Sequence, residues 1–276
     1  MDGWSAGDVA ANGIRLHYAR TGGAKPPLVL AHGVTDDGSC WTPIAEALAA
    51  DRDVVMVDAR GHGCSDAPER GYDFAALVAD LAGLIAALGP RRPAVLGHSL
   101  GAAAALALAG TVPDAPGALL LEDPPPVWMR RPETPEFAAY LERERQLIVE
   151  RKCRGRDALV AERRAEAPHW AEAELVPWAE AKLRVSPHVR EVFDPGAPER
   201  VDWAAALRRI ACPALLIAAD PERGGMVTPE ATAALRGLVP QVRVAHVAGA
   251  GHNVRRDQPA RYLAAVRAFL AEQPAA

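Results

Sequence analysis

The stretch Gly97-His98-Ser99-Leu100-Gly101 contains the side chain best suited to covalent chemistry, the hydroxyl of Ser99. An apolar run at 93–96 precedes it and a run of small residues at 102–109 follows, which predicts a strand that turns sharply into a helix at the serine. Glycines on both sides leave room for such a strained turn, which pushes the hydroxyl out of the sheet. The stretch matches the Gly-x-Ser-x-Gly nucleophile elbow, and a plain glycine-rich connection in an α/β domain is the alternative.

The segments around this serine alternate between strand-like and helix-like patterns. Asn12-Gly13 separates two short runs and predicts a β-hairpin, because this dipeptide accepts the positive φ angles of a type I′ turn. Apolar or alternating runs predict strands at 28–31, 54–57, 93–96, 118–121, 214–217 and 242–247, and helical spacing or capping signals predict helices at 43–48, 77–88, 102–109, from 229, and at 259–270. We expect a doubly wound, mostly parallel α/β sheet whose functional groups lie at the carboxyl ends of its strands.

Composition and charge narrow the function class. The 276 residues carry a net charge of -4 and no basic stripe, which argues against nucleic acid or an anionic membrane as the partner. The start has no basic region followed by an apolar segment, and the apolar runs at 81–88 and 100–109 are too short to span a bilayer, so we expect a cytoplasmic protein. The four cysteines are widely spaced, so we expect neither a disulfide framework nor a metal site.

In their order along the chain, these features resemble the α/β-hydrolase family over nearly the full length. The resemblance rests on the His32-Gly33 turn, the Asp-x-Arg-Gly-x-Gly-x-Ser stretch at 58–65, the elbow at 97–101, a helical segment after the next strand, and the late Gly251-His252. It implies the family's order of serine, acid and histidine, with a helical cap inserted in the sheet domain.

A catalytic triad would supply the base and the orienting carboxylate that a weakly nucleophilic serine needs. His252 is the expected base, because it follows the last strand on a glycine-bracketed loop. Asp220 is the expected acid, since it stands at the strand end where the family usually keeps its carboxylate. Two alternatives stay open: Glu222, two residues later, and the pair Glu122 and Asp123 at the end of the preceding strand.

The remaining site expectations concern the oxyanion hole and the pocket. Two backbone N–H groups, those of Val34 and Leu100, are expected to hold the oxyanion. The residues expected to line the substrate pocket are His32, Gly33, His98 and Trp128. His98 is also expected to pack within the elbow.

The resemblance divides the chain into a first core part at 1–123, a helical cap at 124–205 and a second core part at 206–276. Arginine and glutamate alternate through the cap segment around 142–156, which favours a solvated helix face with paired charges. An arginine that reaches inward to a substrate carboxylate is the alternative interpretation. Tryptophans in or beside this segment indicate either an apolar pocket or packing of short helices.

We therefore predict a serine hydrolase that cleaves a small carboxylic ester through an acyl-Ser99 intermediate, without metal or organic cofactor. A lactonase, an amidase, a C–C bond hydrolase or a cofactor-free perhydrolase would keep the same triad. A ligand-binding receptor with little turnover is the alternative from another class. The expected partner is a small ester-like molecule, and the sequence indicates no particular oligomeric state.

Overall fold

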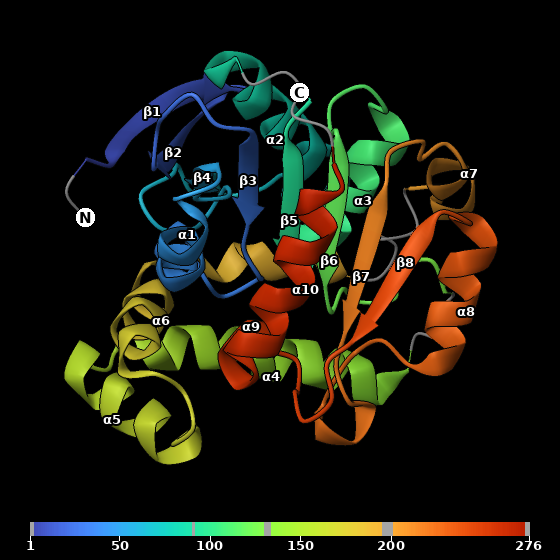
Figure 1. Cartoon of the computed structure of the whole chain (residues 1–276). Coiled ribbons are helices and arrows are strands. Elements are labelled where there is room, and N and C mark those ends of the chain that lie inside the picture. The colour runs from blue at the N-terminus through green and yellow to red at the C-terminus, as the bar shows by residue number, and fades with distance from the viewer. Residues whose placement is uncertain (1–2, 90–91, 130–133, 195–200, 274–276) are drawn as a thin grey trace.

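A computed structural model describes residues 3–89, 92–129, 134–194 and 201–273 (Figure 1). The central sheet has eight strands in the order β1-β2-β4-β3-β5-β6-β7-β8. Their bounds are β1 Ser5–Ala11, β2 Ile14–Arg20, β3 Pro27–Ala31, β4 Asp53–Val57, β5 Ala94–His98, β6 Ala118–Glu122, β7 Ala214–Ala218 and β8 Val242–His246. All pairs from β4 to β8 are parallel, and β1 and β2 join the edge antiparallel. The expected doubly wound, mostly parallel sheet is confirmed.

The hairpin between β1 and β2 turns where the sequence predicts it. Asn12 and Gly13 have φ angles of 48° and 76°, the left-handed conformation that a type I′ turn needs at both central positions. The pairing runs from Ala11 with Ile14 to Ser5 with Arg20. Local turn chemistry thus fixes the register of this edge of the sheet.

Helices cover both faces of the sheet (Figure 1). One face packs against α2 Phe74–Leu88, α3 Leu100–Thr111, α7 Trp203–Arg208 and α8 Pro229–Leu238. The other packs against the 3₁₀ turn η1 Gly38–Trp41, α1 Thr42–Leu48, α9 Val254–Asp257 and α10 Pro259–Ala271. Successive residues of a strand divide between the two cores: Val29 faces the first, and Leu28 and Leu30 face the second. This explains why the strands are continuous apolar runs.

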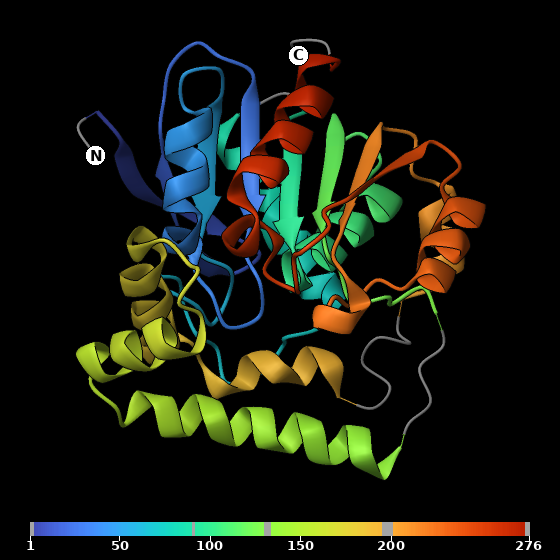
Figure 2. The ribbon, with the colours of Figure 1, turned by 60° about the horizontal axis from the view of Figure 1, so that its bottom comes forward.

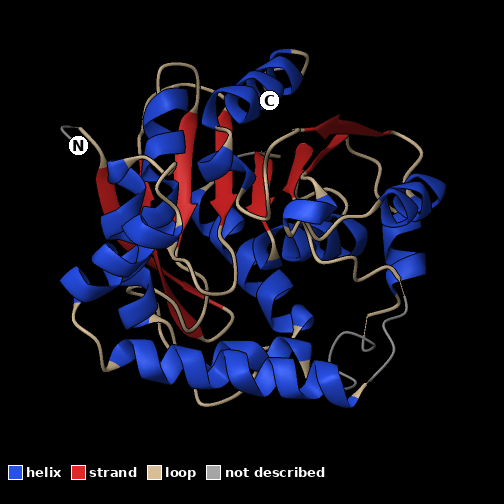
Figure 3. Cartoon of the chain, turned by 90° about the horizontal axis from the view of Figure 1, so that it is seen from below, coloured by secondary structure: helices blue, strands red, loops and turns tan. Residues whose placement is uncertain are grey.

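Between β6 and β7 the chain forms helices instead of strands. We call α4 Pro135–Lys152, α5 Arg156–Glu166, α6 Glu172–Arg184 and the 3₁₀ segment η2 Pro187–Phe193 the helical insertion. Figures 2 and 3 show it as a separate layer beyond the edge toward which the parallel strands point. Part of it has a small apolar core of its own, built around Leu159, Leu175 and Trp178. The division at 124 and 205 stays a prediction, and residues 130–133 and 195–200 lie outside the described part of the chain.

None of the helices within the described ranges combines the length and the apolar character that a bilayer crossing requires.

Candidate active site

Ser99 stands between the end of β5 and the start of α3 with a strained backbone. Its φ and ψ angles are 50° and -115°, a backbone conformation that L-residues rarely adopt. A Cβ atom at Gly97 would lie 2.4 Å from the backbone of Gly101, and one at Gly101 would lie 2.2 Å from the carbonyl oxygen of Ala31. Both glycines are therefore required for the close approach of helix and strand that creates the turn.

The register between β5 and β6 brings Asp123 beside the serine. His98 pairs with Glu122, and the backbone N–H of Ser99 donates to the carbonyl oxygen of Glu122 at 2.9 Å. Ser99 and Asp123 are thus the first residues beyond the ends of two adjacent strands. Asp123 also has a positive φ, 40°, which is uncommon for aspartate and turns its side chain at the strand end.

His252 contacts Asp123 and no other carboxylate among the described residues. Its Nδ1 lies 2.7 Å from Oδ2 of Asp123, whose side chain is fully buried. The same carboxylate accepts hydrogen bonds from the backbone N–H groups of Met226 and Val227. His98 Nε2 lies 3.0 Å from the carbonyl oxygen of His252 and fixes the loop from the other side. Since Nδ1 donates to a carboxylate, Nε2 of His252 carries the lone pair that can act as a base.

The sequence-based choice of Asp220 as the partner of His252 is corrected by this geometry. Asp220 accepts from His246 Nε2 and from the backbone N–H of Gly249, each at 2.7 Å. These donors lower the pKa of the Asp220 carboxyl, the Gly249 N–H most. Glu222 is exposed on the 3₁₀ turn η4 Pro221–Arg223. Asp220 follows β7, which lies one strand further from β5 than β6 does, and its carboxylate pairs locally.

Glu122, the other open alternative, points away from His252. Its carboxylate accepts from the backbone N–H of Arg255 at 3.0 Å and faces the guanidinium of the same arginine. Burial raises the pKa of Glu122, although Arg255 opposes that shift.

The turn after β3 carries Val34, one of the expected oxyanion donors. The N–H of Asp36 donates to the carbonyl oxygen of Gly33 at 3.1 Å, and the N–H of Gly101 donates to that of His32 at 3.1 Å. A Cβ atom on Gly33 would lie 2.7 Å from His98 Nδ1, so only glycine lets the turn pass this close to the elbow. Val34 and Leu100, the other expected donor, flank Ser99 from these two segments.

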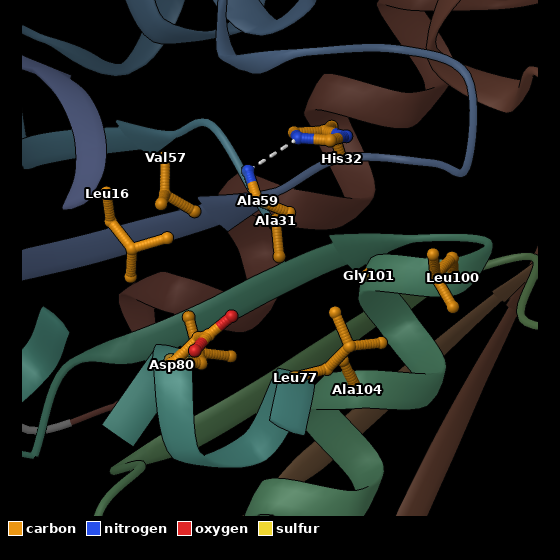
Figure 4. Close-up of a pocket in the computed structure, with 11 residues that line it drawn as sticks. Leu16, Ala31, His32, Val57, Ala59, Leu77, Asp80, Leu100, Gly101 and Ala104 are labelled. Carbon is orange, nitrogen blue, oxygen red and sulfur yellow. Dashed lines mark hydrogen bonds between the residues drawn. The ribbon is translucent and has the colours of Figure 1, made fainter. Parts of the chain in front are cut away.

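His32 occupies a place other than the expected substrate pocket. Its Nε2 accepts from the N–H of Ala59 at 3.0 Å, as Figure 4 shows, and its Nδ1 donates to the carbonyl oxygen of Gly33 at 2.8 Å. Burial lowers the pKa of His32, so the ring is neutral in this tautomer. His32 lines a hollow of about 40 Å³ between the sheet and the helices α2 and α3, together with Leu100. The ring therefore braces the turn after β3 instead of lining the larger cavity at Ser99.

A cavity of about 430 Å³ lies between the strand ends and the helical insertion. Ser99, His252, Gly33, Val34 and His98 line it from the core side. Trp128 is not among the lining residues: its indole N–H donates to the carbonyl oxygen of Ala231 and its ring packs on the core, which corrects its expected place in the pocket. The ring fixes the chain that leaves β6.

Cationic side chains outnumber carboxylates in the rest of the cavity wall. Five of them are Arg151, Arg163, Lys182, Arg190 and Arg256, against the two carboxylates Asp36 and Glu144. Three of the five are paired with buried or half-buried acids: Arg190 with Glu144, and Lys182 and Arg256 with Asp36. Arg163 has a buried Nε without a partner among the described residues, and its guanidinium lies 4.2 Å from the centre of the Trp178 ring. The sequence leaves an inward arginine as an alternative to a solvated helix face, because the spacing of charges does not show which face of a helix meets a cavity.

One further group has metal-ligand composition. His17 of β2 and Asp58 and Cys64 of the segment after β4 bring ligand-type atoms within 4.8 Å of one another. His17 Nδ1 is engaged with Asp8, and the Asp58 carboxylate accepts from the N–H groups of Gly38 and Cys64. The group is therefore explained by hydrogen bonds that stabilise the loop after β4.

Known proteins resemble this chain in sequence and in fold. The model of the alpha/beta hydrolase family matches residues 28–266. The chain belongs to the alpha/beta hydrolase family. It is 35% identical over 271 residues to N-formylmaleamate deformylase of Pseudomonas putida, with 96% of each chain covered. It is 28% identical over 265 residues to 2-(acetamidomethylene)succinate hydrolase of Mesorhizobium japonicum, with 91% of this chain and 90% of that one covered.

A solved structure extends the likeness to three dimensions. The crystal structure of an N-formylmaleamic acid deformylase from Pseudomonas putida S16 superposes with a TM-score of 0.77 at 27% identity, covering 95% of this chain and all of that one. This alpha/beta hydrolase is therefore an enzyme with hydrolase activity, and the relatives named here act on small molecules.

Proposed function

We propose that this alpha/beta hydrolase cleaves the amide bond of a small N-acyl compound that carries a carboxylate. The observation that carries the proposal is the cavity at Ser99, where the helical insertion contributes cationic side chains in excess of acids. A carboxylate is the substrate group that such a wall would hold, because arginine binds it with two parallel hydrogen bonds. The two relatives named above hydrolyse N-formylmaleamate and 2-(acetamidomethylene)succinate, which are both acidic N-acyl compounds.

The proposed mechanism is acyl transfer to Ser99. His252 Nε2 removes the proton of the serine hydroxyl as the oxygen attacks the acyl carbon, and the Asp123 carboxylate stabilises the imidazolium that forms. The backbone N–H groups of Val34 and Leu100 donate hydrogen bonds to the negatively charged oxygen of the tetrahedral intermediate. His252 then gives the proton to the leaving nitrogen, and a water activated by the same ring releases the acid from Ser99.

Arg163 and Arg151 are the proposed contacts of the substrate carboxylate. Both line the cavity from the helical insertion, and no described carboxylate is ion-paired with Arg151. Among the described residues, Arg163 has one ion-pair contact, with the exposed Glu166 at 3.2 Å, and its buried Nε has no hydrogen-bond partner. The proposal takes up the amidase alternative of the sequence-based prediction because the two relatives act on N-acyl compounds, and the cationic wall supports a carboxylate on the substrate.

The test is a substrate panel read by product and by adduct. N-formylmaleamate, its methyl ester and p-nitrophenyl acetate are offered to the wild type, to Ser99→Ala and to Arg163→Met, with released acid and acyl-Ser99 measured by mass spectrometry. We expect Ser99→Ala to lose all turnover and the adduct. Arg163→Met should raise KM about tenfold or more for the carboxylate alone, the loss of one charge-assisted hydrogen bond. Equal efficiency on acid and methyl ester in the wild type would refute the amide-acid proposal.

A further inference from the structure

A cluster of six ionised side chains is buried where the helical insertion meets the site. Its members are Asp36, Glu122, Glu174, Lys182, Arg255 and Arg256, each at most 5% exposed. Three acids and three cations leave the cluster without net charge. Burying ions costs several kcal/mol each, and such clusters are weak sources of stability compared with apolar packing. Their position therefore needs a reason other than stability.

Asp36 is the centre of the cluster. Its Oδ1 accepts from Lys182 Nζ at 2.9 Å, and its Oδ2 accepts from Arg255 at 2.8 Å and lies 3.1 Å from Arg256. The cations keep the pKa of the Asp36 carboxyl well below its usual value despite burial, which on its own would raise it. The backbone N–H of Asp36 also closes the turn that begins at Gly33, so the cluster is anchored on a residue of that turn.

Lys182 connects that turn to the helical insertion. It belongs to α6, and besides Asp36 it donates to the carbonyl oxygen of Thr35 at 2.7 Å. Two consecutive residues of the turn, 35 and 36, are thus held by one ammonium group from a segment about 147 residues away in the chain. The N–H of Val34 precedes them directly.

The other members of the cluster fix the histidine loop. The backbone N–H of Arg255 donates to Glu122, the neighbour of Asp123. Arg256 donates to Asn253, which follows His252, and to Glu174 of α6. The same cluster therefore touches the turn of Val34, the loop of His252 and the end of β6.

We propose that Lys182 and Asp36 are positioning residues that hold the turn after β3 so that the Val34 N–H points at the oxyanion. This inference rests on the proposed acyl transfer at Ser99. It makes α6 of the helical insertion part of transition-state stabilisation, in addition to forming the cavity wall. A displacement of about 1 Å in such a donor costs about 100-fold in rate, and loss of one donor costs about 100- to 1,000-fold in kcat.

The experiment compares Lys182→Met with Lys152→Met. Lys152 also belongs to the insertion and donates to a backbone carbonyl, that of Leu183, but it is exposed and outside the cluster. Active sites are titrated with a fluorophosphonate, so that kcat refers to folded enzyme. We expect Lys182→Met to lower kcat 10- to 100-fold with KM changed less than threefold, and Lys152→Met to match the wild type.

A boronic acid that forms a tetrahedral adduct with Ser99 gives the second readout. Its affinity should fall in Lys182→Met by about the same factor as kcat, while the affinity of the acid product stays unchanged. If Lys182 had a purely structural role, Lys182→Met would lower Tm, and kcat and boronate affinity per titrated site would not fall together. If Lys182→Met does not fold, Lys182→Gln, which keeps a donor for Thr35, is measured in its place. Its kcat and its boronate affinity are both referred to titrated sites, so that an unfolded fraction cannot account for a change in either. The two should again fall by about the same factor.

Two results overturn the inference. One is an unchanged kcat and boronate affinity in the Lys182 variant. The other is a rise in KM alone, which would mean that the ammonium group binds substrate. Failure of the proposed acyl transfer would look different, since the wild type itself would then form no acyl-Ser99 or boronate adduct.

Discussion

Replacing Asp123 by asparagine removes the charge behind His252 and keeps the size of the side chain. The distance of 2.7 Å between Oδ2 and Nδ1 corresponds to about 6 kcal/mol between an imidazolium and a carboxylate at an effective dielectric constant of about 20. The imidazole side chain is 31% exposed, so water screens part of this energy, and the amide keeps a neutral hydrogen bond. We expect kcat to fall about 1,000- to 10,000-fold.

The matched control is Asp220→Asn. It makes the same chemical change in the carboxylate that pairs with the exposed His246, so we expect kcat within twofold of the wild type. Both variants are assayed for turnover on the best substrate of the panel, with Tm and active-site titration to correct for folding. Asp123 also accepts from Met226 and Val227, so a lower Tm in Asp123→Asn is expected and does not explain a loss of kcat per titrated site.

The reasoning would be refuted by either of two outcomes. One is an Asp123→Asn enzyme with more than a tenth of the wild-type kcat. The other is an Asp220→Asn enzyme that loses as much as Asp123→Asn does, because the distances place the Asp220 carboxylate on another histidine.

Two further predictions follow from the turn after β3. Burial lowers the pKa of His32 in the folded protein, so as the pH falls below about 6.5 the unfolded chain binds a proton that the folded protein does not, and the free energy of unfolding falls by up to about 1.4 kcal/mol per pH unit. Urea unfolding between pH 7.5 and 5 measures how the free energy of unfolding depends on pH. This dependence should be weaker in His32→Gln by the equivalent of up to one bound proton, and an identical dependence in both proteins would contradict the prediction. In Gly33→Ala, the added Cβ lies 2.7 Å from His98 Nδ1, and since His98 is bonded to the carbonyl of His252, we expect kcat to fall at least tenfold. Turnover per titrated site measures this. Wild-type activity would contradict the prediction, because it would show that the His98 ring can move aside without disturbing the site.

The sheet and the elbow were predictable because their signals are local. Asn12-Gly13 favours a hairpin through the positive φ angles of these two residues alone. The glycines at 97 and 101 are the residues that permit the strained turn at Ser99. Apolar runs identify parallel strands since both faces of such a sheet are covered. Each of these features depends on a few neighbouring residues.

The acid was not predictable in the same way. The choice between Asp123 and Asp220 depends on which strand lies next to β5 and on the register of His98 with Glu122, and neither is written in the local sequence. The only local signal was the aspartate directly after an apolar run. Trp128 was misplaced for a similar reason, because an aromatic ring near a cavity can equally well face a helix such as α8.

The buried cluster around Asp36 also limits how modular this enzyme can be. Helical insertions between two strands are natural units for exchange between relatives, since their ends lie close to the sheet. Here, a chimera with a foreign insertion would lose Lys182 and Glu174, so that Asp36 loses its ammonium partner and Arg256 loses one of its two carboxylate partners. Breaking a buried ion pair by removing one partner costs about 3–5 kcal/mol, a large part of the stability of a typical domain. A transplanted insertion would have to bring an ammonium group and a carboxylate at these two places of α6, whatever substrate its outer helices were chosen to admit.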